Sequence, residues 1–267
     1  MIRDITIGQY YPAKSVIHKL DPRTKLFGTL VFIISVFLFH SIAGYAVATV
    51  FLAGMILIST VPVKFIFKGL KAIFMILLIT MVFNILLTPG EVLWKIGIFT
   101  ITKEGISMAV RMAIRLIYLV IGSSLMTLTT TPNQLTDGLE KSLRPLNKIH
   151  VPVHEIAMMM SIALRFIPIL LEETDKIMKA QIARGADFES GNLIQKVKNM
   201  VPLLVPLFIS AFRRANDLAM AMEARCYHGG DDRTQMKPLH YAKRDHVAYL
   251  VLFVYLAVAI GFRVMGW

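Results

Sequence analysis

Residues 42–61 read IAGYAVATVFLAGMILISTV, twenty positions without a charged side chain. A helix rises about 1.5 Å per residue, so this run measures about 30 Å, the thickness of the hydrocarbon core of a bilayer. Backbone polar groups inside that core have to be satisfied within the segment, which favours a helix. The stretch therefore predicts a membrane-spanning helix in an all-α fold.

The composition of the whole chain agrees with a membrane protein. Hydrophobic residues make up 56% and charged residues 17% of its 267 positions, with a mean hydropathy of +0.63, whereas globular proteins carry about 25% charged residues. The net charge of +12 could indicate nucleic-acid binding, but the Lys and Arg residues lie at the boundaries of apolar runs rather than among aromatics on a soluble face. We therefore expect the lipid bilayer, and no nucleic acid, as a partner.

Four further stretches are apolar enough, with their flanks, to cross a bilayer: Leu26–His40, Ala72–Leu87, Ile106–Thr130 and Val247–Arg263. The third carries Arg111 and Arg115 one helical turn apart, so we expect both to face the bundle or a headgroup level rather than lipid. The sequence thus predicts about five transmembrane helices, four within residues 26–131 and one within 247–267.

Two other apolar stretches are Ile156–Leu171 and Met200–Phe212. The first contains Arg165, and both contain proline and run into charged residues. A charge at mid-membrane costs at least about 2.5–3.5 kcal/mol. We interpret these stretches as too short to span, and as the apolar faces of cytoplasmic helices.

The distribution of Lys and Arg orients the chain. With five spans and the N-terminus inside, the outer segments hold only Lys95, Lys103 and Arg263. Sixteen Lys or Arg residues lie between Asn133 and His246, in agreement with the positive-inside rule. The sequence therefore predicts a multi-pass protein of the cell membrane, with residues 1–25 and 132–246 in the cytoplasm.

Segment 132–246 reads as a folded helical domain, because it also carries thirteen Asp or Glu residues. Proline and glycine residues mark the ends of two long helices in this domain, one over about 153–185 and one over about 192–226.

The two helices end alike, as AQIARG (180–185) and AMEARC (221–226). An arginine near a helix C-terminus is favoured by the helix dipole alone, so a purely structural role stays open. The repetition indicates a paired device for a partner with two similar halves, built from Ala183, Arg184, Gly185, Ala224, Arg225 and Cys226.

Three alanines of the second long helix share one face: Ala211, Ala215 and Ala219. A face of small residues lets helices approach closely and cross, although helix propensity explains the same pattern equally well. A crossing at this face would direct the two arginine ends to separate places.

The residues needed for several other activities are missing. The phosphate-binding pattern Gly-x-x-x-x-Gly-Lys-[Ser/Thr] does not occur. His150 and His154 have a spacing typical of metal ligands, but Pro152 between them disfavours a regular helix. The sequence therefore predicts no catalytic residue, no cofactor and no metal site on this chain.

Several segments resemble the transmembrane T component of energy-coupling factor (ECF) transporters. They are Leu20–Lys25, Thr129–Pro132, Leu164–Pro168, Ala180–Gly185, Pro202–Pro206 and Arg213–Arg225, with Arg233 and Thr234 beyond. The resemblance extends from about residue 20 to 262, and the two alanine–arginine helix ends are its most specific part.

The resemblance implies a membrane part and two long coupling helices that cross under it as an X. In that family the two arginines insert into grooves of two ABC-type ATPase subunits, which bind ATP and magnesium, and a separate S component in the membrane binds the vitamin or metal ion. Arg184 matches the first motif, whereas the second motif usually ends in Gly or Ser, where this chain has Cys226. The implied function is that of a non-catalytic scaffold that couples ATP hydrolysis to vitamin or micronutrient uptake.

Two alternatives remain at this point. A self-sufficient secondary carrier or permease would need polar or discontinuous elements at mid-membrane and would transport without ATPases. An intramembrane enzyme would need a nucleophile–base pair or a metal pair among the spans. The substrate, the identity of the two ATPases and the number of S components that share the scaffold stay open.

Overall fold

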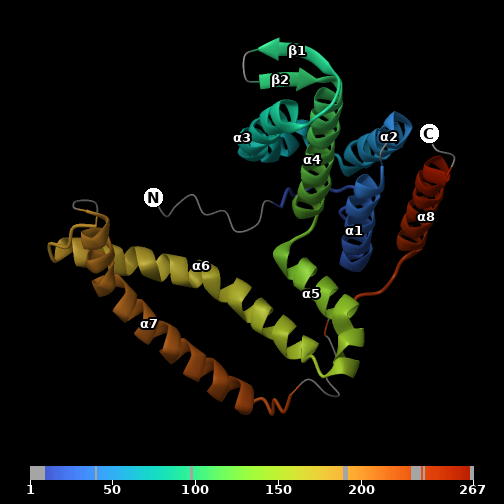
Figure 1. Ribbon diagram of the computed structural model, residues 1–267. Helices are drawn as coiled ribbons and strands as arrows, with labels where there is room; N and C mark the ends of the chain where they lie inside the picture. The colour runs from blue at the N-terminus through green and yellow to red at the C-terminus, as the bar shows by residue number, and fades with distance from the viewer. Residues whose placement is uncertain are drawn as a thin grey trace. The chain divides into compact units, whose positions relative to one another are not determined.

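The structure, a computed structural model, describes residues 10–39, 41–96, 99–188, 192–229, 236 and 238–264. Figure 1 shows these residues as a set of helices with one short β-hairpin. In chain order the elements are α1 (Pro22–Leu38), α2 (Ile42–Ser59), α3 (Val63–Leu87), β1 (Val92–Ile96), β2 (Phe99–Thr102), α4 (Lys103–Thr129), α5 (Pro132–Leu143), the 3-10 helix η2 (Arg144–Ile149), α6 (Val153–Ala183), α7 (Leu193–Glu223) and α8 (Lys243–Val264). The prediction of an all-α membrane protein is confirmed, with the hairpin as an addition.

The chain divides into two compact units. The bundle unit comprises Gly8–Gly138 and Leu239–Trp267 and contains α1 to α4 and α8. The arm unit comprises Leu139–Pro238 and contains α6 and α7. The segment 132–246, predicted to be cytoplasmic, extends beyond the arm unit at each end, and its membrane boundaries stay a prediction.

Side chains at the helix starts explain why two helices begin earlier than their apolar runs. Asp21 accepts a hydrogen bond from the N–H of Arg23, with Pro22 at the first helical position of α1. The Thr102 hydroxyl accepts from the N–H of Gly105 at 3.0 Å at the start of α4. Such caps satisfy backbone donors that the first turn leaves without a partner.

Three helices among the described residues are long and apolar enough to cross a membrane, namely α4, α6 and α8. Helix α3 adds a fourth if its two parts, Val63–Lys71 and Ile73–Leu87, which meet at 57°, form one span. Helices α1 and α2 have 17 and 18 residues, about 26–27 Å at ~1.5 Å per residue, so they need their flanks to cross the ~30 Å core. The five-span topology stays a prediction.

Helix α6 differs from expectation. We interpreted Ile156–Leu171 as too short to span, and that length argument is wrong. Helix α6 is continuous over 31 residues with Pro168 inside, and its most apolar part has a mean hydropathy of 1.6, equal to that of α4. The apolar run extends N-terminally, and only isolated charges such as Arg165 interrupt it. Its cytoplasmic placement depends on the charges after Leu171 and stays a prediction.

The loop between α3 and α4 contains a hairpin that the sequence did not predict. Strands β1 and β2 pair antiparallel, with Val92 opposite Thr102 and Ile96 opposite Phe99. Both strands are rich in β-branched and aromatic residues, which favour strands. They have only five and four residues, too few for a clear alternating pattern in the sequence.

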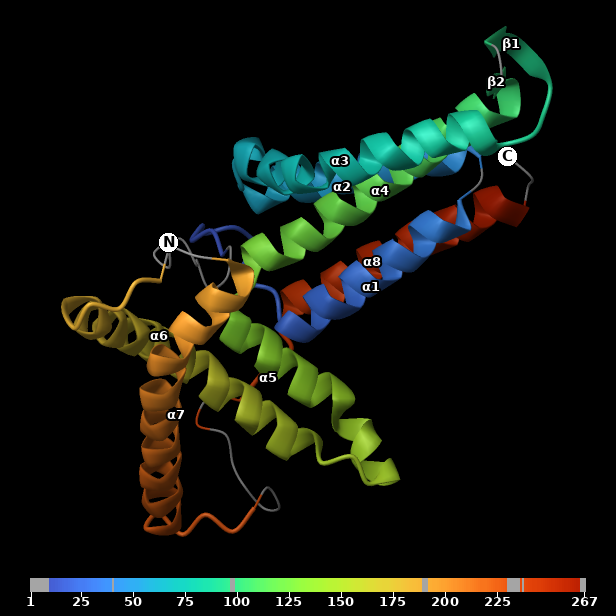
Figure 2. The ribbon, with the colours of Figure 1, turned by 60° about the vertical axis from the view of Figure 1, so that its left-hand side comes forward.

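Helices α1 and α2 of the bundle unit each pack against α4 and α8, and α3 packs along α4. Figure 2 shows α1 beside α8 and α3 beside α4. The rings of Phe51 and Tyr255 stack in the core with centroids 4.3 Å apart, and the Tyr255 hydroxyl lies 2.6 Å from the Ser35 hydroxyl. This packing fixes α8 against the other helices of the bundle.

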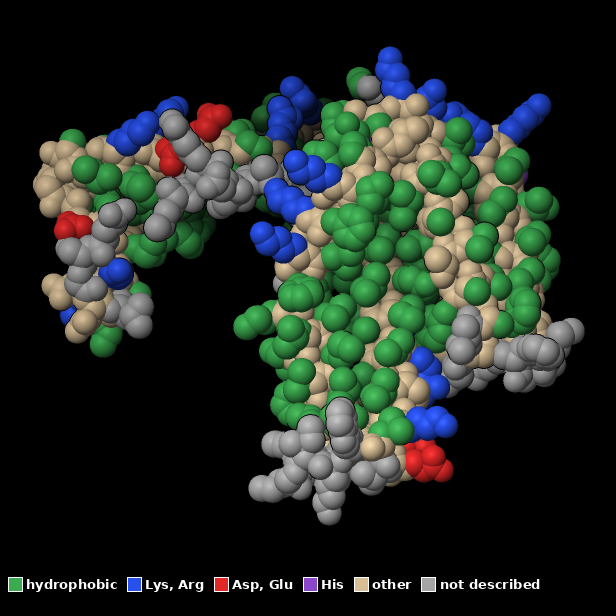
Figure 3. All heavy atoms as spheres, turned by 90° about the horizontal axis from the view of Figure 1, so that it is seen from above, with side chains coloured by type: hydrophobic (Ala, Val, Ile, Leu, Met, Phe, Trp, Pro, Cys, Tyr) green, Lys and Arg blue, Asp and Glu red, His purple; other side chains and the backbone are tan. Residues whose placement is uncertain are grey.

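The outer surface of the bundle is strongly apolar. Figure 3 shows hydrophobic side chains over the middle of the visible face and Lys and Arg side chains toward its ends. On α3, for example, Phe74, Met75 and Phe83 are 61%, 71% and 59% exposed. Apolar surface of this extent is typical of contact with lipid.

Candidate docking site

Helix α6 ends in a left-handed turn at Gly185, whose φ is 88°. The N–H of Gly185 donates to the carbonyl oxygen of Ile182 at 2.9 Å. The next N–H, of Ala186, donates to the carbonyl oxygen of Gln181 at 2.9 Å. These two bonds form the Schellman motif, which satisfies carbonyls at a helix end. Arg184 is the last residue before the left-handed position.

Helix α7 ends in the same way at Cys226, whose φ is 56°. The N–H of Cys226 donates to the carbonyl oxygen of Glu223 at 2.9 Å, and that of Tyr227 donates to Met222 at 3.1 Å. The cysteine therefore takes the position that glycine holds in α6. Its presence leaves the cap geometry intact, and Arg225 again precedes the left-handed residue.

Arg184 and Arg225 thus hold structurally equivalent positions. Both are exposed, as are Ala183 and Ala224. Neither arginine forms a salt bridge with another residue in the described ranges. A guanidinium offers five N–H donors in a planar fork that matches a carboxylate. The structure therefore presents two similar cationic hydrogen-bond donors, one at the end of each long helix.

Polar contacts join α6 to α7. The Glu173 carboxylate accepts from Nε and Nη2 of Arg214 at 3.2 and 3.1 Å, and also from the hydroxyl of Ser210. Nearer the connecting loop, Nε2 of Gln181 donates to the carbonyl oxygen of Pro202 at 3.3 Å. Sequence reasoning missed the contacts of Glu173, because its partners lie on a different helix.

The three alanines of α7 lie beside these contacts. Ala211 is half-buried, whereas Ala215 and Ala219 are exposed. Ser210 and Arg214, one position before Ala211 and Ala215, make the polar contacts to α6. The helix-crossing role of the three alanines stays a prediction.

A buried polar cluster ties the start of α1 to the start of α8. The Asp245 carboxylate, 1% exposed, accepts from the N–H groups of Asp21 and Ala242, each at 2.8 Å. Arg23 binds Asp21 through Nε at 3.0 Å and Nη2 at 2.8 Å, and its guanidinium lies 3.9 Å above the ring of Tyr241. Burial alone would raise the pKa of Asp21, but the hydrogen bonds and charge of Arg23 outweigh it and hold the pKa below its ordinary value.

Lys25 extends this cluster to α4. Its Nζ donates to the carbonyl oxygen of Thr129 at 2.8 Å and to that of His18 at 3.2 Å. We call Asp21, Arg23, Lys25, Thr129 and Asp245 the anchor. The segments Leu20–Lys25 and Thr129–Pro132, which carried part of the family resemblance, therefore meet at one end of the bundle.

Arg115 faces the bundle, as the sequence predicted. Its Nη2 donates to the carbonyl oxygen of Phe39 at 3.2 Å, just beyond the end of α1, and lies 3.4 Å from the Tyr45 hydroxyl. A cation at this place satisfies a carbonyl that the helix end leaves free. Arg111 is exposed and lies 3.4 Å from the hydroxyl of Ser107 on its own helix.

The two histidines with metal-like spacing lie in different structural elements. Nδ1 of His154 lies 2.8 Å from Oε1 of Glu140, whereas His150 ends η2 in a left-handed conformation. Across the described part of the chain, no group of three His, Cys, Asp or Glu side chains is placed to hold a metal ion.

Fold and site together define a class of protein, a mainly helical membrane subunit with two exposed, arginine-bearing helix ends. Residues 13–237 match the family described as CbiQ, Cobalt transport protein. The chain is similar to the "Energy-coupling factor transporter transmembrane protein EcfT" of Clostridium kluyveri, with 58% identity over 266 residues, 99% of this chain and 98% of the relative. The proteins of the same name from Ruminiclostridium cellulolyticum and Bacillus subtilis are 54% and 47% identical, over 97% and 98% of this chain and 97% and 100% of theirs.

The chain therefore belongs to the CbiQ/EcfT family of transmembrane proteins of energy-coupling factor transporters. This confirms the resemblance noted from the sequence. The chain is a membrane subunit of a transporter and is not itself a catalytic enzyme.

Proposed function

We propose that the chain is the scaffold that transmits ATP-driven movement from two ABC-type ATPase subunits to a substrate-binding S component. The observation that carries the proposal is the equivalence of Arg184 and Arg225, which lie exposed in the same turn at the ends of two long helices. Two equivalent donors suit a partner with two equivalent acceptors. A pair of related ATPase subunits, identical or different, has that property.

Each arginine would bind an acidic group in a groove of one ATPase subunit. A guanidinium binds a carboxylate through two parallel hydrogen bonds, which fixes orientation as well as affinity. Losing one partner of such a buried pair costs about 2–5 kcal/mol, because the other charge is left unpaired. The two arginines together would therefore dominate the attachment of the ATPases.

Movement of the ATPases would reach the membrane through α6 and α7. ATP and magnesium would bind to the ATPases, since this chain carries no phosphate-binding pattern. Glu173 links α6 to α7 through Arg214 and Ser210, so closure of the ATPases would displace the two helices together. The S component in the membrane, which holds the vitamin or other micronutrient, would then reorient. In this arrangement the N-terminal segment and α6 and α7 face the cytoplasm.

Co-purification of the ATPases with the tagged full-length chain tests the docking assignment. The double variant Arg184→Ala with Arg225→Ala should lose the ATPases while the chain stays inserted in the membrane. Lys179→Ala with Arg213→Ala is the matched control, because it also removes one exposed cation from each of α6 and α7. Arg214 is unsuitable as a control, since it binds Glu173. Equal loss in both double variants would show diffuse charge attraction instead of docking.

A liposome assay separates the proposal from a self-sufficient carrier. The purified chain alone should move no vitamin across the bilayer and should hydrolyse no ATP. Addition of the ATPases and an S component should give ATP-dependent uptake. Uptake by the chain alone would reject the scaffold function.

A further inference from the structure

The bundle unit contains an apolar cavity of about 210 Å³ beside the anchor. Helices α1, α2, α4 and α8 line it together with Val16, Ile17 and Leu20. An engineered apolar cavity of about 150 Å³ already binds benzene. The cavity is therefore large enough for part of a hydrocarbon ligand.

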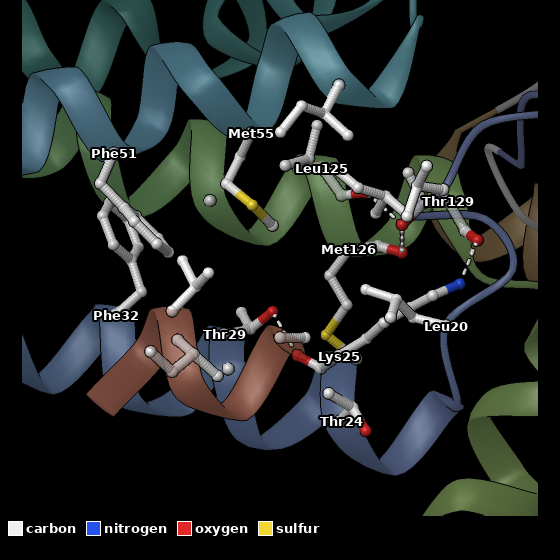
Figure 4. A pocket seen from close by; sticks show the side chains of 18 of the residues that line it. Leu20, Thr24, Lys25, Thr29, Phe32, Phe51, Met55, Leu125, Met126 and Thr129 are labelled. Carbon is white, nitrogen blue, oxygen red and sulfur yellow. Dashed lines mark hydrogen bonds between the residues drawn. The ribbon is translucent and has the colours of Figure 1, made fainter. Parts of the chain in front are cut away.

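The two ends of the cavity differ in chemistry. Figure 4 shows the rings of Phe32 and Phe51 at one end and Lys25 and Thr129 at the other, with Met55 and Met126 between them. Lys25 directs its Nζ to the Thr129 carbonyl oxygen, so its aliphatic stem, not its charge, faces the cavity. Methionine side chains are flexible and adapt to irregular apolar ligands.

The exposed residues among those that line the cavity show where the cavity opens to the surface. Val16, Ile58 and Val247 are 54%, 50% and 60% exposed, whereas Leu52 and Leu125 on the opposite wall are each 6% exposed. The cavity therefore opens between the N-terminal segment, the last turn of α2 and the first turns of α8. Each of these exposed side chains is apolar.

The cationic side chain of Arg244 lies at this mouth. Arg244 lines the cavity in the first turn of α8 and is exposed. A second exposed cation, Lys19, lies next to the lining residue Leu20. The opening is thus apolar inside and basic at its rim.

We propose that the cavity holds one acyl chain of an anionic membrane phospholipid, with the lipid phosphate bound by Arg244. Water does not suit the cavity, because a buried water needs two to four polar partners. An empty space would leave its lining atoms without contacts on one side. The bilayer supplies acyl chains at an apolar mouth, and basic rims between transmembrane helices favour anionic headgroups.

Native mass spectrometry of the full-length chain in detergent tests the site, with equimolar phosphatidylglycerol and phosphatidylcholine as probes. The wild-type chain should retain one phosphatidylglycerol. Ala248→Trp places a large ring in the cavity and should reduce retention at least about tenfold, since an overpacked site leaves no room for the chain. Ala257→Trp is the matched control, because Ala257 is exposed on the same helix and lies outside the cavity.

A second pair of variants tests the headgroup. Arg244→Gln should reduce the preference for phosphatidylglycerol about tenfold, as expected for the loss of a hydrogen bond between charged groups. Lys243→Gln, at a neighbouring position that does not line the cavity, should leave the preference unchanged. Equal binding of the two lipids by the wild-type chain would overturn the proposal, and so would a bound mass equal to that of a free fatty acid.

A cross-linking experiment does not depend on the folding of Ala248→Trp. A diazirine amino acid in place of Met55, in the assembled transporter in native membranes, should react with phospholipid. Reaction with a partner subunit would show that a protein segment fills the cavity and would overturn the proposal. Equal lipid retention by the wild-type chain and a correctly folded Ala248→Trp variant would also overturn it.

Discussion

Cys226 and Gly185 hold the same position in two helix-ending turns, each as the left-handed residue that follows an exposed arginine. Their φ angles are 56° and 88°. A side chain in this conformation costs about 1–2 kcal/mol, a cost that glycine avoids. Cys226 therefore forms this turn at some expense of local stability.

Replacing Cys226 by glycine should stabilise the end of α7. A gain of about 1 kcal/mol corresponds to roughly fivefold slower hydrogen exchange of the Tyr227 amide, which closes the turn. Gly185→Ala should speed exchange of the Ala186 amide by a similar factor. No Cβ contact within 4 Å opposes a side chain at Gly185, so backbone strain alone would cause the change. Unchanged exchange in both variants would contradict the equivalence of the two turns.

The equivalence of Arg184 and Arg225 predicts that single alanine substitutions weaken ATPase binding by similar factors. The expected loss is roughly 30- to several-thousand-fold, which corresponds to about 2–5 kcal/mol. Lysine at either position should restore only part of the affinity, because an ammonium cannot form the two-bond fork. Titration of the purified chain with the ATPase pair measures these factors. A large loss from one substitution and none from the other would assign docking to one helix.

The bounds of the long helices were predictable because their signals are local. We expected helices over about 153–185 and 192–226, and the structure has α6 at Val153–Ala183 and α7 at Leu193–Glu223. Proline before α6 and Gly185 after it mark its ends in the sequence. The turn at Cys226 was not predictable in the same way, since cysteine has no preference for the left-handed conformation.

The anchor could not be predicted from the sequence, because it depends on tertiary contacts. Asp21 and Asp245 are 224 residues apart in the chain and lie next to each other at the starts of α1 and α8. Glu173 and Arg214, 41 residues apart, meet only because α6 and α7 pack together. Helical periodicity shows which face of a helix is apolar, but it does not show which polar residue of another helix will lie opposite.

The contact of Glu173 with Arg214 should make a small contribution to the pairing of α6 and α7. The two side chains are 22% and 40% exposed, and partly exposed pairs contribute about 0.2–1 kcal/mol. A double-mutant cycle with Glu173→Ala and Arg214→Ala, followed by thermal unfolding in detergent, should give a coupling energy in that range. Glu172→Ala, at an exposed neighbouring position, should show no coupling to Arg214→Ala. A coupling energy of zero in the first cycle would show that this contact plays no part in the proposed transmission of movement through α6 and α7.

Acidification should destabilise the bundle unit through His18. Burial of the ring lowers the pKa of His18 below its ordinary value of 6.5, although its hydrogen bond to the Tyr11 carbonyl acts in the opposite direction. The folded chain then binds a proton less readily than the unfolded chain. The contribution of neutral His18 to the stability of the folded chain is therefore complete above about pH 6.5. It is lost as the pH falls through the lower pKa that His18 has in the folded chain.

Thermal unfolding of the purified chain between about pH 7 and pH 5 measures this effect. His18→Gln should show a smaller decrease in unfolding temperature on acidification than the wild-type chain. His228→Gln, which changes an exposed histidine after α7, should keep the wild-type decrease. Identical pH profiles for His18→Gln and the wild-type chain would contradict the assignment to His18.

Asp245 should be among the most sensitive residues of the anchor. Its two carboxylate oxygens accept from the N–H groups of Asp21 and Ala242. Alanine in its place would leave both donors without an acceptor at a site where the carboxylate is 1% exposed. A buried donor without a partner costs about 1–3 kcal/mol, so the loss of an acceptor for both donors in Asp245→Ala should destabilise the chain by about 2–6 kcal/mol.

Asp245→Asn separates the geometry from the charge. The amide keeps one acceptor oxygen, but its NH₂ group faces one of the two backbone donors, so the loss should be intermediate. Asp217→Ala removes an exposed carboxylate from α7 and should change the unfolding temperature little. Because α1 and α8 begin at this contact, the destabilisation in Asp245→Ala should appear as faster hydrogen exchange in the first turns of both helices. Equal protection of these turns in Asp245→Ala and the wild-type chain would show that packing alone holds α8 in place.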